Sequence, residues 1–332
     1  MKAAFSLLWL LLSICVGLPA SAWGGSGDVA SVSLAGRNYV RLLDWARVNN
    51  LETRWLKRDE TIQLTNRGVR LVFAMDSREA EINDLNVWLS YPVLLRNGSA
   101  YVSEADLKTA VKPILYPPRN SASAKIKTIV LDPGHGGKDP GNQDGSRQEK
   151  KYALLLAEEL SDQLKHAGFK TSLTRTSDTL IDLPVRPDIA RRRGADLFIS
   201  LHWNSAGSGK NEVKGVETYC LTPEGASSTN AGGEVIGAGA KPGNLYNNKN
   251  MFLAYTIQRS LRKNLTVEDR GIRRARFAVL RTAEMPAVLI EGGFMSHPAE
   301  SKHIYDPAYR KQMAKAIVEG VLAYRAQVEQ PR

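Results

Sequence analysis

Four residues that lie far apart in the sequence, His135, Glu149, His202 and Glu291, are of the types that metal-assisted hydrolysis requires. Two histidines and one carboxylate form a common zinc-binding set, which leaves one coordination position open for water. Zinc lowers the pKa of such a water to about 7, so that hydroxide is available at neutral pH. A further carboxylate that does not bind the metal can act as general base and proton shuttle. The sequence offers one candidate for each of these roles.

Each of these residues also has a plainer interpretation. His135 could lie on a surface turn, and His202 could be a hydrogen-bonded histidine of the core. Glu149 could complement the positive N-terminus of a helix, and Glu291 could pair with an arginine. All four, however, fall at predicted strand or helix ends, where ligands gather in open α/β sheets. The other histidines, His166, His297 and His303, are expected at a helix end or on the surface.

The surrounding sequence predicts the elements that position these side chains. The apolar run in 126–132 predicts a buried strand, and the glycine-rich segment after it, which contains the first histidine, allows sharp turns and close backbone approach. The first glutamate begins a predicted helix over 149–167. The second histidine lies near the end of 196–204, an apolar segment expected to be a central strand covered on both faces. The second glutamate lies in a predicted strand over 287–294.

From residue 126 onward, strand and helix patterns alternate, which argues for the α/β class with a layered sheet flanked by helices. Further strands are expected at 170–176, 214–221 and 277–280, and further helices at 187–194, 247–265 and 307–327. Residues 222–247 are rich in glycine, serine and asparagine and predict a long loop, and loops of that length are usually functional or mobile.

The segment 31–115 predicts a smaller α+β domain. It contains a helical spacing of apolar residues, a hairpin over 61–74 and a helix that begins near Ser103. No cluster of titratable residues stands out in it. Two prolines followed by small polar residues predict a linker at 116–125. The candidate site residues therefore all fall in a second domain, 126–328.

The N-terminus predicts export. Lys2 precedes an apolar run over 3–18, and the Ala-Ser-Ala sequence at 20–22 matches a cleavage site, so residues 1–22 are expected to be a signal peptide. Cys15 raises the alternative of a lipoprotein, but the isoleucine before it is not the small residue that such sites prefer. No later stretch reaches the length of a membrane helix. We therefore expect a mature protein without a membrane span.

The 332-residue chain has a formal net charge of +11, with 24% charged and 43% hydrophobic residues. These fractions are typical of a soluble globular protein, and the length allows two domains. Surplus positive charge favours anionic cell-wall polymers, membrane surfaces or nucleic acid, and export argues against nucleic acid. Without the signal peptide one cysteine remains, Cys220, so no internal disulfide is expected. The alternating pattern around Cys220 predicts that it is buried.

Residues 126–326 resemble the zinc-dependent N-acetylmuramoyl-L-alanine amidases that carry a DPGHGG signature. The resemblance rests on segments that occur in the family order: IVLDPGHGGKDPG, RQEKKYALLLAEEL, ADLFISLHWNSA and MPAVLIEGGFMSHPAE. It implies that His135, Glu149 and His202 bind one Zn2+ ion and that Glu291 is the catalytic carboxylate. Two departures, HWN for the usual HAN and EGGF for ELGF, change no catalytic residue type.

Residues 31–115 resemble the small N-terminal domain of copper amine oxidases, without a copper site, and this implies a targeting, spacing or wall-binding role. In some amidases an inserted helix near the position of 222–247 blocks the metal. The glycine-rich sequence here makes autoinhibition by this loop a hypothesis only.

The sequence thus predicts an exported, cell-wall associated, periplasmic or extracellular peptidoglycan hydrolase. It would cleave the amide between N-acetylmuramic acid and L-alanine of the stem peptide. Asn204 and Arg273 are candidate substrate contacts, although solvated arginines beside a helix are an equal alternative for the run 273–276. Two rival functions are a zinc peptidase acting on wall peptides and a non-catalytic wall-binding protein. The need for a protein activator stays open.

Overall fold

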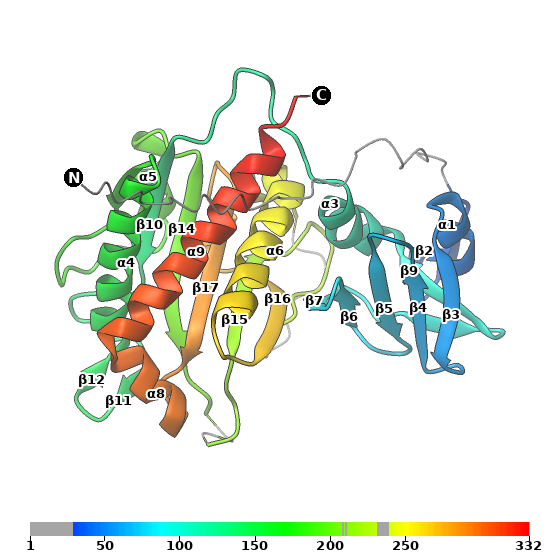
Figure 1. Ribbon diagram of the computed structural model, residues 1–332, viewed down its shortest axis with the longest axis horizontal. Helices are drawn as coiled ribbons and strands as arrows, with labels where there is room; N and C mark the ends of the chain where they lie inside the picture. Colours follow the sequence, from blue (N-terminus) through cyan, green and yellow to red (C-terminus); the bar gives the residue numbers. More distant parts are fainter. Residues whose placement is uncertain (1–28, 208, 210, 231–238, 332) are drawn as a thin grey trace, which may run out of the picture.

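The computed structural model describes residues 29–207, 209, 211–230 and 239–331. The predicted signal peptide, 1–22, lies outside these residues. A larger part, from about residue 126 to the C-terminus, lies beside a smaller part formed by 29–115 (Figure 1). In the portion of the chain that the structure describes, no helix combines the length and apolar character needed to span a membrane.

The larger part alternates strands and helices as the sequence predicts. Its strands are β10 (Thr128–Pro133), β11 (Gln143–Asp144), β12 (Arg147–Gln148), β13 (Lys170–Leu173), β14 (Leu197–Asn204), β15 (Val216–Leu221), β16 (Asp269–Ala275) and β17 (Ala287–Phe294). Its helices are α4 (Glu149–His166), α5 (Val185–Arg192), α6 (Asn247–Asn264), α7 (Ala278–Arg281), α8 (Pro298–Tyr305) and α9 (Pro307–Val328), with a 3-10 turn, η3, at Pro242–Tyr246.

The smaller part consists of short strands and helical turns. Its strands are β1 (Ser31–Leu34), β2 (Arg37–Arg41), β3 (Glu52–Lys57), β4 (Thr61–Thr65), β5 (Arg70–Ala74), β6 (Glu79–Ile82), β7 (Leu85–Trp88), β8 (Leu94–Arg96) and β9 (Ser99–Ser103). Its helices are α1 (Leu42–Val48), α2 (Glu104–Asp106) and α3 (Lys112–Leu115), with a π-helical turn, η2, at Leu107–Val111. The Ser103 hydroxyl caps α2 by accepting a hydrogen bond from the Asp106 N–H, as the sequence predicts.

Eleven strands of the described chain form one sheet, in the order β13-β10-β14-β17-β15-β16-β7-β6-β5-β4-β3. The neighbouring strands β13, β10, β14 and β17 run parallel to one another. Strand β15 runs antiparallel to β17 and parallel to β16. Strand β7 of the smaller part pairs with β16 through Val87 and Ile272. The α/β class with flanking helices is confirmed. The domain boundaries stay a prediction, since one sheet runs through both parts.

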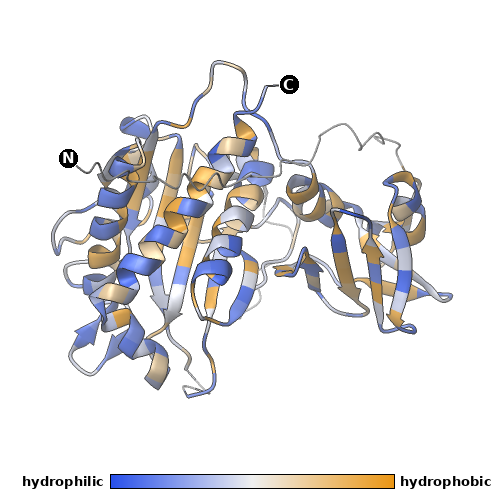
Figure 2. Ribbon diagram, viewed as in Figure 1, coloured by the Kyte–Doolittle hydropathy of each residue, from blue (hydrophilic) through white to orange (hydrophobic). Residues whose placement is uncertain are grey.

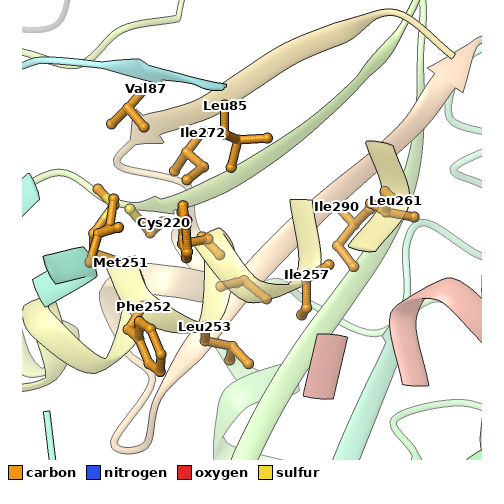
Figure 3. Packing of buried hydrophobic residues seen from close by; sticks show 14 of the residues in the cluster. Leu85, Val87, Cys220, Met251, Phe252, Leu253, Ile257, Leu261, Ile272 and Ile290 are labelled. Atoms are coloured by element: carbon orange, nitrogen blue, oxygen red, sulfur yellow. The ribbon is translucent and has the colours of Figure 1, made fainter. Parts of the chain in front are cut away.

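Alternating side chains of the central strands enter two separate cores. Helices α4, α6 and α9 cover the sheet face that is turned toward the viewer in Figure 1, and the central strands are hydrophobic along most of their length (Figure 2). On this face Ile290 of β17 and Cys220 of β15 meet Ile257 and Met251 of α6 (Figure 3). Neighbouring strand residues such as Leu289 instead join a second core with α5 and α7. Burial of apolar surface on both faces, at about 25 cal/mol per Å2, holds the strands in place.

One predicted strand is wrong. Residues 277–280 were expected to be extended, but Leu280 N–H and Arg281 N–H both donate to the Phe277 carbonyl and form the helical turn of α7. Val279 and Leu280 are buried in the second core. Apolar, β-branched residues favour a strand only where a neighbouring strand is available to pair, and here the neighbouring strand β15 ends at Leu221, which pairs with Ala275.

Candidate metal centre

The structure brings His135, Glu149 and His202 together at the carboxyl ends of the parallel strands β10 and β14. Each offers a potential ligand atom, and these atoms all lie within 4.8 Å of one another. Glu149 Oε1 lies 3.1 Å from His135 Nε2 and 2.9 Å from His202 Nδ1. Strands β10 and β14 are parallel neighbours, so the loop after β10 and the end of β14 meet. Glu149 is the first residue of α4, which begins beside the same strand ends.

The donor set and its surroundings fit a zinc ion. His135 Nδ1 lies 2.8 Å from Asp139 Oδ2, so Nδ1 carries the hydrogen and the lone pair of Nε2 is left for a metal. The carboxylate of Glu149 is fixed by two backbone donors, because Asn142 N–H donates to Oε2 at 2.8 Å and Trp203 N–H donates to Oε1 at 3.1 Å. Two imidazoles and one carboxylate with an oriented ring are the pattern of a zinc site.

Two glycines of the loop after β10 make this close assembly possible. A Cβ added to Gly134 would lie 2.3 Å from His202 Cε1, and one added to Gly141 would lie 2.6 Å from both Glu149 Oε2 and His135 Cδ2. His135 itself has a φ of 61°, which is uncommon for a residue with a side chain. The glycine-rich motif therefore allows the side chains of the candidate metal centre to approach one another closely.

Two buried arginines, which no sequence pattern singles out, hold the backbone of the same loop in place. Arg186 donates to the His135 carbonyl at 2.8 Å and forms an ion pair with Asp132 at 3.0 Å. Arg175 donates to the Gly134 carbonyl at 2.6 Å. Asp132, the carboxylate that ends the first apolar run, thus has a structural role. No local signal in the sequence distinguishes these two arginines from the many solvated ones.

The surroundings of the three residues stabilise a negative Glu149. Burial alone would raise the pKa of its carboxyl group, but hydrogen bonds with His135 and His202 lower that pKa below its usual range. For His135, burial alone would lower the pKa. Hydrogen bonds and charge interactions with Glu149 and Asp139 outweigh burial, so the pKa of His135 is raised. A carboxylate that is already ionised is ready to bind a cation.

The pKa of Glu291 is shifted in the opposite direction from that of Glu149. Its Cα pairs with that of His202 across β14 and β17, which places it next to the three residues described above. Its Oε2 atom is buried and has no hydrogen-bond partner among the described residues. Burial raises the pKa of Glu291 well above its usual range, and the negative charges of Glu149 and Glu217 add to this rise. Such a carboxyl group keeps its proton to a higher pH than an exposed glutamate does, as a general acid requires.

A second carboxylate, Glu217 of β15, lies beside Glu291 and was not among the predicted site residues. Its Cα pairs with that of Glu291, and its side chain is buried. Asn204 Nδ2 donates to Glu217 Oε1 at 2.8 Å, and Arg273 Nε lies 2.5 Å from Glu217 Oε2. The two predicted substrate contacts therefore both bind Glu217. Its signal in the sequence was a charged residue at an inward position of an alternating strand.

Comparison with known proteins places these observations in a family. A family model described as N-acetylmuramoyl-L-alanine amidase matches residues 129–323, which is more than half of the chain. The chain belongs to this amidase family. A second model, described as the copper amine oxidase N-terminal domain, matches residues 26–112. Both resemblances inferred from the sequence are confirmed.

Two curated relatives show how far the similarity extends. The chain is 34% identical over 244 residues to the N-acetylmuramoyl-L-alanine amidase AmiC of Neisseria meningitidis serogroup B, a match that covers 67% of this chain and 57% of that relative. It is 32% identical over 231 residues to AmiA of Escherichia coli, covering 62% of this chain and 79% of AmiA. The chain thus spans little more than half of the first relative.

Solved structures match the amidase part of the fold. An N-acetylmuramoyl-L-alanine amidase from Clostridium difficile 630 has a TM-score of 0.51 and 33% identity, and the match covers 60% of this chain and 97% of that one. The CwlD amidase from Clostridioides difficile, solved in complex with the GerS lipoprotein, has a TM-score of 0.51 and 25% identity, covering 60% and 98%.

Proposed function

We propose that this chain is an exported zinc amidase that hydrolyses the bond between N-acetylmuramic acid and the L-alanine of the stem peptide in peptidoglycan. The observation that carries the proposal is the cluster of His135, Glu149 and His202 beside the buried carboxyl group of Glu291, within a chain of the amidase family. His135, Glu149 and His202 would hold the zinc ion, and Glu291 would be the catalytic acid and base.

The chemistry divides between the metal and the protein. Zinc, when bound, supplies an acidified water and polarises the carbonyl oxygen of the amide. Glu291 accepts a proton from the attacking water as the new carbon–oxygen bond forms. It then donates that proton to the alanine nitrogen as the carbon–nitrogen bond breaks. The raised pKa of Glu291 suits both transfers, because the group must take up the proton and give it back.

The products released from purified sacculi test this proposal. An amidase releases intact stem peptides that begin with L-alanine and carry no sugar, whereas a peptidase releases shorter fragments and a binding protein releases nothing. We expect intact peptides, loss of their release on chelation, and recovery with zinc. Fragments cut within the stem peptide, or release that persists after complete removal of metal, would contradict the proposal.

Location and partners follow from the same assignment. Peptidoglycan as substrate requires export, which residues 1–22 of the sequence would direct. A structural relative was solved in complex with a lipoprotein, which supports testing whether a partner protein activates this chain. The hypothesis of autoinhibition by 222–247 predicts higher activity when 224–245 are deleted, and unchanged or lower activity would count against it.

We also propose that Asn204 and Arg273 contact the substrate while they stay bound to Glu217. Both side chains are only partly buried, so they can also face a ligand. Both are held by the buried Glu217, which limits how far they can move toward a substrate.

A further inference from the structure

We propose that Trp88, which belongs to the smaller N-terminal part, is a positioning residue for the amidase site and acts on it through Arg273 and Glu217. This inference rests on the proposed function, since it concerns the setting of Glu291. It gives the smaller part a role in turnover, in addition to the targeting, spacing or wall binding expected from its sequence.

The junction between the two parts is closely fitted. Trp88 Nε1–H donates to the Arg270 carbonyl at 3.2 Å, and Asn86 N–H donates to Asp269 Oδ2 at 3.0 Å. A Cβ added to Gly271 would lie 2.5 Å from the Asn86 carbonyl oxygen. On the opposite face of the sheet, Val87 and Ile272 lie side by side in the apolar core (Figure 3). Strand β7 therefore continues the sheet of the amidase part.

The ring of Trp88 lies against the guanidinium of Arg273. The Arg273 Cζ is 4.2 Å from the centre of the ring, within the range of a cation–π interaction. The ring covers one face of the guanidinium and restricts where the flexible arginine can go. The Nε atom of the same arginine lies 2.5 Å from Glu217 Oε2 in an ion pair.

Glu217 connects this pair to the reaction centre. It is buried, and a buried carboxylate needs a fixed positive partner because desolvation would otherwise favour its neutral form or its movement. Its Cα pairs with Glu291 on one side and with Gly271 on the other. Its Oε1 holds Asn204, two residues after His202. Trp88, Arg273 and Glu217 thus form a continuous row of contacts that ends beside the proposed catalytic acid.

The inference predicts an effect on turnover, separate from effects on substrate affinity or metal content. Without the ring, Arg273 gains alternative positions, the charge of Glu217 is compensated less well, and Glu291 and Asn204 lose their fixed surroundings. A wall-binding role for the smaller part predicts the reverse pattern, a weaker KM with kcat unchanged, because binding that is equal in ground and transition states does not change kcat.

The experiment uses the full chain loaded with zinc and compares Trp88→Leu, Trp88→Phe and Trp55→Leu. Leucine and phenylalanine both remove the indole N–H, but only phenylalanine keeps an aromatic face. Trp55 is the matched control, since it also lies against an arginine, Arg58, but in β3 at the far edge of the sheet. Rates are expressed per zinc-loaded molecule, so that partial unfolding of a variant does not obscure the result.

We expect Trp88→Leu to lower kcat by about 3- to 30-fold, the range that loss of one cation–π contact supplies, with KM and zinc content unchanged. Trp88→Phe should keep most of the activity, and Trp55→Leu should match the unmodified chain. In metal-free protein, amide exchange over 216–221 should be faster in Trp88→Leu only.

Three results would overturn the inference: a higher KM with kcat unchanged, equal losses in the leucine and phenylalanine variants, or an equal loss in Trp55→Leu. An unmodified chain that releases no stem peptide contradicts the proposed function itself. An active chain that is insensitive to Trp88→Leu contradicts only the positioning role.

Discussion

The two sides of the candidate site each contain a glutamate, and they shift its pKa in opposite directions. On the side built from β10, α4 and β14, Glu149 is surrounded by hydrogen-bond donors, and the pKa of its carboxyl group is lowered. On the side built from β17 and β15, one oxygen of Glu291 has no partner among the described residues, and the pKa of its carboxyl group is raised. The same residue type is thereby suited to hold a cation in one place and a proton in the other.

The largest expected effects come from isosteric changes of these two glutamates. Glu149→Gln should lose bound zinc and with it all measurable release of stem peptides, because a neutral amide is a poor replacement for a ligand carboxylate. Glu291→Gln should keep zinc but lose about 100- to 10,000-fold in activity, the usual contribution of a general acid and base. Metal analysis and peptide release are measured on the same samples.

Glu149→Gln and Glu291→Gln serve as controls for each other, because only one of them is expected to lose zinc. Loss of zinc from Glu291→Gln, or retention of both zinc and activity by Glu149→Gln, would show that the roles of the two sides are assigned wrongly. Arg191→Gln, on the exposed end of α5, changes a charge away from the centre and should alter neither measurement.

A smaller effect is expected from the residue that orients the first histidine. Asp139→Asn keeps the shape of the side chain but removes the charge that faces His135 Nδ1. Partners of this kind typically contribute 10- to 100-fold to metal affinity. We expect zinc affinity, measured by competition with a chelator, to fall by roughly that factor, while activity at saturating zinc falls less. An unchanged affinity would mean that Asp139 does not orient the ligand.

The smallest effect concerns stability of the metal-free protein and its change with pH. The pKa of Glu291 is raised in the folded state, so this group favours folding only while it is protonated and opposes folding as pH rises above its unfolded value of 4.5. Glu291→Gln should therefore stabilise the metal-free protein at pH 7 and have little effect near pH 4.

Glu149 should give the opposite sign. Its lowered pKa contributes stability above the unfolded value of 4.5, and this contribution is lost as pH falls toward the folded value. Glu149→Gln should lower the thermal midpoint at pH 7 and lower it less in acid. Melting curves of both variants and the unmodified chain, each with chelator, test the pair. Shifts of the same sign at pH 7 would remove the contrast between the two sides.

The three residues of the candidate metal centre could be picked out from the sequence because their signals are local. His135 follows a short apolar strand and is flanked by glycines, Glu149 opens an amphipathic helix, and His202 ends a continuous apolar run. Each of these patterns depends on a few adjacent residues. The α/β class followed from the same alternation of strands and helices.

The surroundings of Glu291, which are built from β17 and β15, were less predictable because they depend on which strands pair. Nothing near residue 217 indicates that β15 runs antiparallel to β17 and places Glu217 opposite Glu291. The strand expected at 277–280 became α7 for a related reason, since the neighbouring strand β15 ends at Leu221, opposite Ala275.

By itself, the sequence determined the side chains that can do chemistry, the elements that carry them and the family to which the chain belongs. Tertiary structure decided the difference in pKa between the two glutamates and the contact of Trp88 with Arg273. The physical reason is that residue type and local periodicity are written along the chain. Desolvation, partner charges and strand neighbours arise only when distant segments pack together.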